Sequence, residues 1–405
     1  MPGGEVVVPH RYADQRSLSR RSTRPYSFWC ALLLTSCIGT VGSVHAEGAA
    51  ASSQRKSSHA EAAEQLAIQV NNDRLTLQVA KAPQVYLYGV IDADAPQRFE
   101  ALMKSGKISN GSDIYLNSSG GDLKAGLALG RLFRIGSMVT HLGTPKLGRH
   151  STSVGKPAVC AGACAYAYFG GLYRWAPTGA DRLGLPSYQA MDPKDGSVSQ
   201  SSLTPDEVVS YLKDMDIDPT AITSQLETSH DDIVWLSADQ MIATRLANNG
   251  RLPLLATYQL QSGAPYLILH EVARNSERRI TLLCEPGGTT LTATNTVGAD
   301  QARQIVARGM RSYIEINRVE TPPQQDGNAD VVDQSVVITR TYPSAQLGNL
   351  ISAQSIGAWV SDRKSTLRFG FAFEVDGLKR ILGNFYESCW RYAPWSTQQK
   401  TATSG

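Results

Sequence analysis

The stretch DIYLNSSGGDLKAGLALGRLF, residues 113–133, decides the fold. Its first five residues are typical of a short strand, and the apolar residues from Leu123 onward recur at helical spacing. Between them Ser118-Ser119-Gly120-Gly121-Asp122 ends the strand and opens the helix, so the glycines free backbone amides to point into a cleft beside the helix N-terminus. Taken alone, this stretch also fits an ordinary tight turn, because Gly-Gly after Ser-Ser is common in loops.

A second strand-to-helix junction follows at residues 160–171, CAGACAYAYFGG, where small residues permit close backbone approach. Around the two junctions, strands are predicted at 85–91, 113–117, 137–142 and 158–160, and helices at 95–103, 123–133 and 163–169. Strands that alternate with helices predict parallel βαβ units and an α/β fold. Three further helices with N-cap signals are expected at 205–213, 219–227 and 238–246.

The pattern changes after Gly250, where strands dominate. We expect strands at 266–270, 279–284, 289–294, 313–319, 336–340 and 367–373, with few helical segments between them. The sequence therefore predicts an α/β domain at 66–250 and a smaller β-rich domain at 251–395, followed by a tail at 396–405.

Residues 1–46 have the features of a secretory signal peptide. An arginine-rich segment ends at Arg24, an uncharged run follows from Phe28 to Val44, and Val44-His45-Ala46 offers a small-residue cleavage site. Polar residues interrupt the run, which falls short of the roughly 20 mostly apolar residues of a spanning helix. We expect a periplasmic or secreted protein, with the Ala-, Ser- and Glu-rich residues 47–65 as a flexible tether.

Two variants of export stay open. The sequence Leu34-Thr35-Ser36-Cys37 also fits a lipoprotein cleavage box, which would anchor the protein to a membrane through a lipid on Cys37. Arg20-Arg21 is the pair found in twin-arginine signals, but the residues after it lack the apolar character usual there.

Charge excludes one class of partner. The chain has 39 basic and 36 acidic residues, of which five and two lie in residues 1–46, so 34 of each remain after them. Nucleic-acid-binding proteins need a net or local positive charge to meet phosphate. We therefore expect no nucleic-acid partner.

Four of the six cysteines lie outside the leader: Cys160, Cys164, Cys284 and Cys389. Disulfides are the default for an even number of cysteines in an exported chain. Of the three pairings, Cys160 with Cys164 and Cys284 with Cys389 is favoured, because the two pairs lie in different parts of the chain. Zinc is the rival, but ligand spacing is lacking apart from His150 near the first pair. We predict no metal and no cofactor.

From about Val85 to Ala247 the chain resembles the Clp protease proteolytic subunit and its crotonase-fold relatives, and most closely the exported Clp-like proteins of bacteria. The resemblance is carried in order by residues 86–89, the 117–121 glycine turn, the helix from 123, the 160–171 junction, Leu183-Gly184, 211–219 and 232–237. It implies a repeated ββα domain and subunits that associate into trimers or larger rings.

In that family a serine at a helix N-terminus is the nucleophile, a histidine is the base, and an aspartate orients the histidine. These positions fall on Gly162, Pro186 and Asp232. Glycine has no nucleophilic side chain and proline cannot accept a proton, so acyl transfer loses both central groups.

The family's oxyanion hole is matched by the amides of Gly120 and Ala163, with Gly121 in the same turn. The resemblance therefore implies a non-catalytic, exported Clp-like protein that binds a peptide, protein or envelope ligand. The alternative is a periplasmic serine-type hydrolase or peptidase with a relocated nucleophile. Crotonase-like chemistry needs only the oxyanion hole, but its coenzyme A thioesters are cytoplasmic.

A relocated nucleophile must lie within hydrogen-bond reach of a base and near the oxyanion donors. The candidates are Ser118, Ser119, Cys164 and Ser187, with His141 or His150 as base. His230 and His270 are interpreted as ordinary polar residues.

Aromatic residues are concentrated near the end of the second domain, and we expect them mainly in its core rather than on a ligand surface. They are Trp359, Phe369, Phe371, Phe373, Phe385, Tyr386, Trp390, Tyr392 and Trp395. The alternate spacing of the three residues from Phe369 to Phe373 places them on one strand face.

Overall fold

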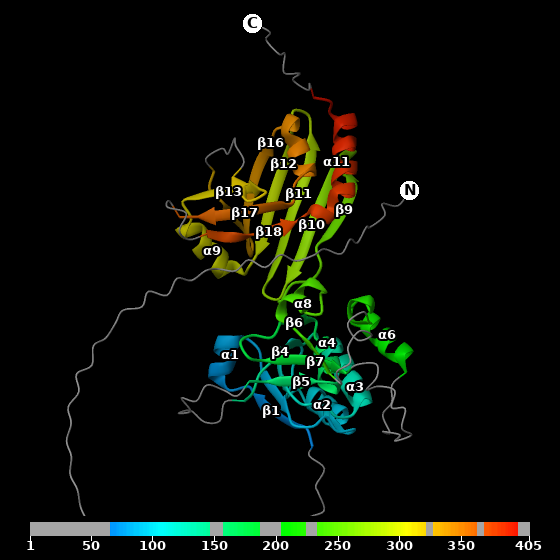
Figure 1. Ribbon diagram of the computed structural model, residues 1–405. Coiled ribbons are helices and arrows are strands. Elements are labelled where there is room, and N and C mark those ends of the chain that lie inside the picture. The colour runs from blue at the N-terminus through cyan, green and yellow to red at the C-terminus, as the bar shows by residue number, and fades with distance from the viewer. Residues whose placement is uncertain are drawn as a thin grey trace, which may run out of the picture. The chain divides into compact units, whose positions relative to one another are not determined.

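The computed structural model (Figure 1) describes residues 65–145, 157–186, 204–223, 233–320, 327–362 and 368–395. The predicted signal peptide, most of the tether, the C-terminal tail, Cys37 and Asp232 lie outside the described residues.

A five-stranded sheet forms the base of the N-terminal region, residues 65–250. Its order is β1 (Ala67–Asn71), β2 (Gln84–Tyr88), β3 (Asp113–Asn117), β4 (Val139–Leu142) and β6 (Tyr173–Arg174). β2, β3, β4 and β6 run parallel, and β1 pairs antiparallel with β2. The predicted parallel βαβ pattern is confirmed.

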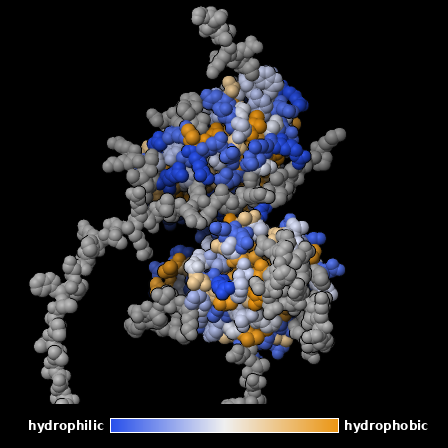
Figure 2. All heavy atoms as spheres, in the orientation of Figure 1, coloured by the Kyte–Doolittle hydropathy of each residue, from blue (hydrophilic) through white to orange (hydrophobic). Residues whose placement is uncertain are grey.

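Helices pack against this sheet through their apolar faces. α2 (Ala95–Lys104) buries Phe99, and α3 (Leu123–Ile135) buries Leu127, Leu129 and Phe133. α4 (Ala163–Phe169) is buried along its whole length, which explains its small and aromatic residues without any charge. α1 (Arg74–Ala80) buries nothing. Its exposed apolar side chains form an apolar patch on the face shown in Figure 2.

A second, three-stranded sheet consists of β5 (Val159–Ala161), β7 (Arg182–Pro186) and β8 (Ile233–Leu236). β5 and β7 are parallel, and β7 and β8 are antiparallel. Thr204 caps α6 (Pro205–Asp214) with a reciprocal capping box to Glu207, as its sequence predicts. Residues 220–223 are helical, in line with the predicted start of the next helix, whose end lies outside the described residues.

The helix predicted at 238–246 is shorter than expected. α8 spans Ala238–Ala243, and Arg245 adopts a left-handed φ of 60°. The carbonyls of Arg245 and Leu246 instead accept hydrogen bonds from the buried guanidinium of Arg174, at 3.1 and 2.9 Å. Burial lowers the pKa of Arg174 to about 10. A buried cation that needs carbonyl partners therefore ends this helix early.

Two antiparallel sheets form the C-terminal region, residues 251–395. The larger has the order β15 (Asp330–Val332), β16 (Ser335–Tyr342), β12 (Gly288–Thr296), β11 (Ser276–Glu285), β10 (Ala264–Ala273) and β9 (Leu255–Gln261). The smaller has the order β14 (Val319–Glu320), β13 (Arg311–Ile316), β17 (Ser355–Ser361) and β18 (Arg368–Glu374). The β-rich character is as predicted, but the sequence analysis missed the strands β9, β15 and β17.

The helices of this region were also missed. α9 (Ala299–Arg308) contacts β15, β16 and β17, and α10 (Leu347–Ile351) and the short 3-10 turns at Ser344–Gln346 and Asp376–Leu378 accompany α11. α11 (Lys379–Tyr392) contacts β9, β10 and β11 and buries Ile381, Leu382, Phe385 and Cys389. Its aromatic residues belong to one amphipathic helix, which the strand-dominated pattern concealed.

Both predicted disulfide pairs are present. Cys160 is bonded to Cys164, and Cys284 to Cys389, which joins β11 to α11. The long loop that the second bond closes makes it the larger constraint on the unfolded chain.

The buried apolar residues form two separate hydrophobic cores. One cluster is built from residues between Leu66 and Ala247, and the other from residues between Leu254 and Cys389. Among the residues that the structure describes, no helix is long and apolar enough to cross a membrane.

The nine aromatic residues predicted for the second core divide into three groups. Tyr386 and Trp395 are partly buried and pack against the core. Trp359, Phe371, Phe373 and Phe385 are buried, as expected. Phe369 is 39% exposed, and Trp390 and Tyr392 are exposed on α11, so the expectation of core burial is wrong for these three. Phe369 shares a strand face with the buried phenylalanines, but it lies near the first residue of an edge strand, where the core ends.

Candidate functional site

The turn between β5 and α4 has an unusual backbone at Gly162. Its φ of 55° and ψ of −119° lie in a region that residues with a Cβ rarely adopt. A strained strand-to-helix turn of this kind is where nucleophilic serines are presented in several hydrolases. Among the described residues, a Cβ built at Gly162 would meet only Gly120 Cα, at 3.9 Å. Within that part of the chain, the position beside Gly162 is therefore open and no side chain fills it.

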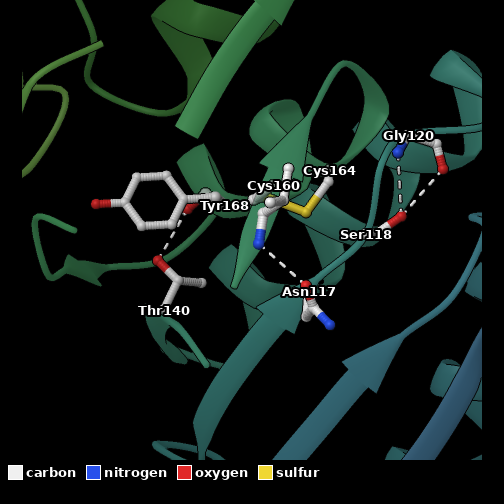
Figure 3. The surroundings of a disulfide bond; sticks show 8 residues. Asn117, Ser118, Gly120, Thr140, Cys160, Cys164 and Tyr168 are labelled. Carbon is white, nitrogen blue, oxygen red and sulfur yellow. Dashed lines mark hydrogen bonds between the residues drawn. A yellow bond between two sulfur atoms is a disulfide. The ribbon is translucent and has the colours of Figure 1, made fainter. Parts of the chain in front are cut away.

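We call the turn at Gly162, between β5 and α4, the elbow. The glycine turn that follows β3 lies directly against it (Figure 3). Ser118 N–H donates to Val159 O at 2.7 Å, and Ala161 N–H donates to Ser118 O at 3.0 Å. The Asn117 side-chain oxygen accepts from Val159 N–H at 3.0 Å. These bonds extend β3 along β5, so the two junctions that the sequence singled out meet.

The amides of the turn are not all available. Gly120 N–H donates to Ser118 Oγ at 3.2 Å, and Ser118 Oγ donates to Gly120 O at 3.0 Å, as Figure 3 shows. The amides of Gly121 and Ala163 have no hydrogen-bond partner among the described residues. The free donors of this turn are therefore those of Gly121 and Ala163, and the Gly120 amide is held within the turn.

The short disulfide clamps the elbow. Cys160 is the middle residue of β5 and Cys164 lies in the first turn of α4, with Gly162 between them, and both cysteines are buried. The bond consumes the Cys164 thiol, so Cys164 is not a nucleophile while the bond is intact. Its position fixes the direction in which the chain leaves the strand.

Pro186, where the sequence resemblance places a histidine, lies on the same sheet as β5. Gly162 N–H donates to Gly184 O on β7 at 3.1 Å, and Pro186 is the last residue of that strand. β5 and β7 are parallel, so their carboxyl ends lie at one edge of the sheet. β8 begins at Ile233 opposite Pro186. Asp232, the position of the orienting aspartate, lies outside the described residues.

Among the candidates for a relocated nucleophile, the described serines differ in availability. Ser118 is buried and bonded within the turn, and Ser119 is exposed. Ser187 and His150 lie outside the described residues, as does His230.

The candidate base His141 is already engaged. Its Nε2 lies 3.0 Å from Asp113 Oδ1, and the Arg274 guanidinium donates two hydrogen bonds to the same carboxylate. Burial alone would raise the pKa of Asp113, but the hydrogen bonds from His141 and Arg274 outweigh it and lower that pKa below its usual value. His270 pairs with Glu277 at 2.9 Å.

Aromatic rings stack across neighbouring strands beside this cluster. Tyr86 stacks on Tyr115 at 4.8 Å, Tyr115 on His141 at 4.8 Å, and His141 on Trp175 at 5.2 Å, all between ring centroids. Burial raises the pKa of Tyr115 to about 12. Sequence reasoning missed this stack of rings, although a ring-bearing side chain within each of β2, β3 and β4 and another directly after β6 were a signal for it.

No protein-family model and no curated protein matches the chain. Among solved structures, it is similar to a serine-to-alanine mutant of the 1510-N membrane-bound stomatin-specific protease, with 14% identity and a TM-score of 0.27 over 40% of this chain and 75% of that chain. A lysine-to-alanine mutant of the same protease, in complex with a substrate peptide, gives 15% identity and a TM-score of 0.28 over 40% and 71%.

A mutant of ClpP1 from Listeria monocytogenes is similar at 17% identity and a TM-score of 0.27, over 43% of this chain and 94% of that chain. The structural neighbours are thus Clp-like proteases. Likeness at this level is coarse, so no site residue is taken from these structures.

Proposed function

We propose that this chain is an exported Clp-protease-like protein without an intact Ser-His-Asp triad, which binds an extended peptide or protein ligand and does not hydrolyse it. The observation that carries the proposal is Gly162, which occupies a strained elbow beside unpartnered amides with no side chain to act as a nucleophile. Pro186, at the matching end of β7, has no group that accepts a proton.

The chemistry that remains favours binding. Acyl transfer needs an activated nucleophile and a base within hydrogen-bond reach of it. The amides of Gly121 and Ala163 can still donate to a carbonyl or carboxylate oxygen. A ligand with a backbone of carbonyl groups, such as a polypeptide, suits such donors. The two disulfides support the exported part of the proposal, since disulfides persist in oxidising compartments.

Labelling with a fluorophosphonate serine probe, together with a casein cleavage assay, tests the loss of catalysis. Wild-type protein should neither label nor cleave. Restoring the side chains in Gly162→Ser with Pro186→His should give time-dependent labelling, provided that the oxyanion donors are in place. Robust labelling of the wild type, abolished by Ser187→Ala or Ser119→Ala, would instead establish a hydrolase with a relocated nucleophile.

Binding is tested by fluorescence anisotropy with labelled, unfolded casein. Gly162→Leu fills the open position and should weaken binding at least tenfold. The control is Gly179→Leu, because Gly179 also has a positive φ, of 64°, and no atom of the described residues lies within 4 Å of a Cβ built there. Equal affinity of the two variants would show that the elbow does not contact the ligand.

Two further parts of the proposal have simple tests. Mass spectrometry of the mature protein separates cleavage after Ala46 from lipidation at Cys37. Light scattering on the mature protein measures whether it associates into the trimers or rings of Clp-like proteins.

A further inference from the structure

One edge of the large C-terminal sheet is open to pairing. β9 is the last strand of that sheet, beside α11 (Figure 1), and among the described residues it pairs with β10 alone. Its seven residues, LATYQLQ, include no charged residue and no proline, and its register with β10 runs without a bulge. Charges, prolines and bulges are the usual devices that keep an exposed edge strand from pairing with another chain. β9 has none of them.

The other edge strands of the two C-terminal sheets are protected. β15 has three residues and begins with Asp330, and β14 has two residues and ends with Glu320. β18 carries Arg368 at one end and Glu374 at the other. Short length and charge both disfavour pairing with a further strand. Within the part of this region that the structure describes, β9 is therefore the edge that is suited to association.

The turn between β9 and β10 determines which backbone groups of β9 face outward. Ser262 and Gly263 both have positive φ, 52° and 89°, as in a two-residue hairpin turn of type I′. Gln261 and Ala264 flank this turn opposite each other and form its hydrogen-bonded pair. Hydrogen-bonded and non-hydrogen-bonded pairs alternate along an antiparallel ladder. Every second residue of β9 therefore directs its N–H and C=O away from β10.

These residues are Ala256, Tyr258 and Leu260. Leu260 is opposite Pro265, which has no N–H, and this agrees with the alternation. Among the described residues, no turn, loop or side-chain hydrogen bond reaches the backbone groups of the three residues. Their side chains share one face of the sheet, the face on which Ala256 and Tyr258 pack against the core with α11. Leu260, at the end of this row, is 62% exposed.

The sequence of β9 is complementary to a second copy of itself. When two β9 strands run antiparallel about Tyr258, Ala256 of each copy lies opposite Leu260 of the other. The outward-facing backbone groups then meet, and each such pair exchanges two hydrogen bonds. The exposed Leu260 side chain gains an apolar neighbour on the α11 face, and Thr257 lies opposite Gln259 on the other face. A second copy thus satisfies the edge and covers Leu260 without bringing charges together.

We propose that two copies of this chain associate through β9, edge to edge and antiparallel about Tyr258, so that their large sheets join into one continuous sheet. Each copy contributes the same strand, so the contact is a closed two-fold interface. It is separate from the elbow at Gly162 and does not depend on the function proposed for it. Any association of the N-terminal regions would be additional to this contact.

Disulfide trapping tests the register of the two strands. In the proposed pair, Thr257 of one copy and Gln259 of the other form a non-hydrogen-bonded pair with Cα atoms about 4.5 Å apart, which a disulfide can bridge. A mixture of full-length Thr257→Cys and Gln259→Cys proteins should therefore give a cross-linked dimer on a non-reducing gel. Each variant alone should give no more dimer than wild type, because two identical positions are then about 7–8 Å apart on the diagonal.

Sedimentation velocity on the full-length protein tests the contribution of the edge to assembly. Leu260→Lys places a charge on the exposed edge and should raise the dissociation constant at least tenfold, so that the particle mass falls twofold at a concentration where wild type is associated. Val319→Lys is the matched control, because Val319 is 65% exposed on β14, another edge strand. It should keep the wild-type mass.

Four results would overturn the proposal. They are the absence of a cross-link in the mixture, equal cross-linking of either cysteine variant alone, an unchanged mass for Leu260→Lys, and a wild-type protein that lacks the association. In the last case, binding of a labelled peptide with the sequence of residues 255–261 to wild type, and not to Leu260→Lys, would identify an extended peptide as the occupant of the edge instead of a second copy.

Discussion

Gly126 determines how closely α3 can approach the start of α4, and its replacement by alanine is a direct test of the site's construction. A Cβ at Gly126 would lie 2.4 Å from Ala163 O and 2.9 Å from Ala163 C and Cα. These are backbone atoms, which cannot rotate away as a side chain can. The α4 N-terminus, together with the elbow before it, must therefore move.

The expected size follows from two opposing effects. Overpacking of a well-packed core costs about 1–3 kcal/mol, and alanine gains up to about 1 kcal/mol over glycine within a helix. Gly126→Ala should thus lower the free energy of unfolding by about 1–2 kcal/mol, measured by urea denaturation with intact disulfides. Introduced into the Gly162→Ser, Pro186→His background, it should also slow labelling by the serine probe.

Gly383 in α11 provides the matched control. It also lies within a helix, but a Cβ there would meet nothing within 4 Å. Gly383→Ala should leave stability unchanged or raise it by up to about 1 kcal/mol. If Gly126→Ala proves as stable as Gly383→Ala, the close contact of α3 with α4 does not constrain the elbow, and the reasoning is refuted.

Three further sets of substitutions test contacts that stabilise the two hydrophobic cores. Replacing Cys284 and Cys389 by alanine opens a link between residues 105 positions apart, which should cost about 4–5 kcal/mol in urea denaturation; a loss below about 1 kcal/mol would contradict this. Asp92 has its pKa lowered by hydrogen bonds from its arginine partner, so it stabilises the fold above its unfolded pKa and loses that effect as the pH falls. Asp92→Asn should therefore flatten the decline of unfolding free energy as the pH falls from about pH 5 towards pH 1. Arg274→Ala leaves the buried Asp113 carboxylate with fewer partners and should cost about 3–5 kcal/mol, much of which a second change, Asp113→Asn, should restore; a double variant no more stable than the single one would disprove the pairing.

The sequence predicted the elements around the elbow well because their signals are local. Thr204 and Pro205 mark the start of α6, and α4 has the predicted bounds of Ala163 and Phe169. The alternation of strand and helix also limits the connections to parallel crossovers. Each of these inferences needs only neighbours in the chain.

The features that escaped prediction depend on partners distant in sequence. Asp113 and Arg274 are 161 residues apart, and nothing near either residue indicates the pair. α11 was hidden because its aromatic residues fit a strand-rich segment as readily as a helix whose buried face packs on β10 and β11. The hydrogen bond from the Gly120 amide to the Ser118 hydroxyl lies within a local turn. Residue types alone nevertheless do not show which amide donates to that hydroxyl.

The backbone of the elbow is held in place without any side chain at position 162, where a nucleophile would have to stand. The backbone conformation at position 162, φ 55° and ψ −119°, costs a residue with a Cβ about 1–3 kcal/mol, and glycine accepts it without that strain. The supports of the elbow do not involve a side chain at this position, since they are the bonds of Ser118 to the β5 backbone, the Gly162 bond to β7 and the disulfide from Cys160. Replacing a serine by glycine here therefore removes the nucleophile, keeps the free amides in place and stabilises the turn. Glycine at position 162 thus fits the backbone of the turn and at the same time leaves the turn without a nucleophilic side chain.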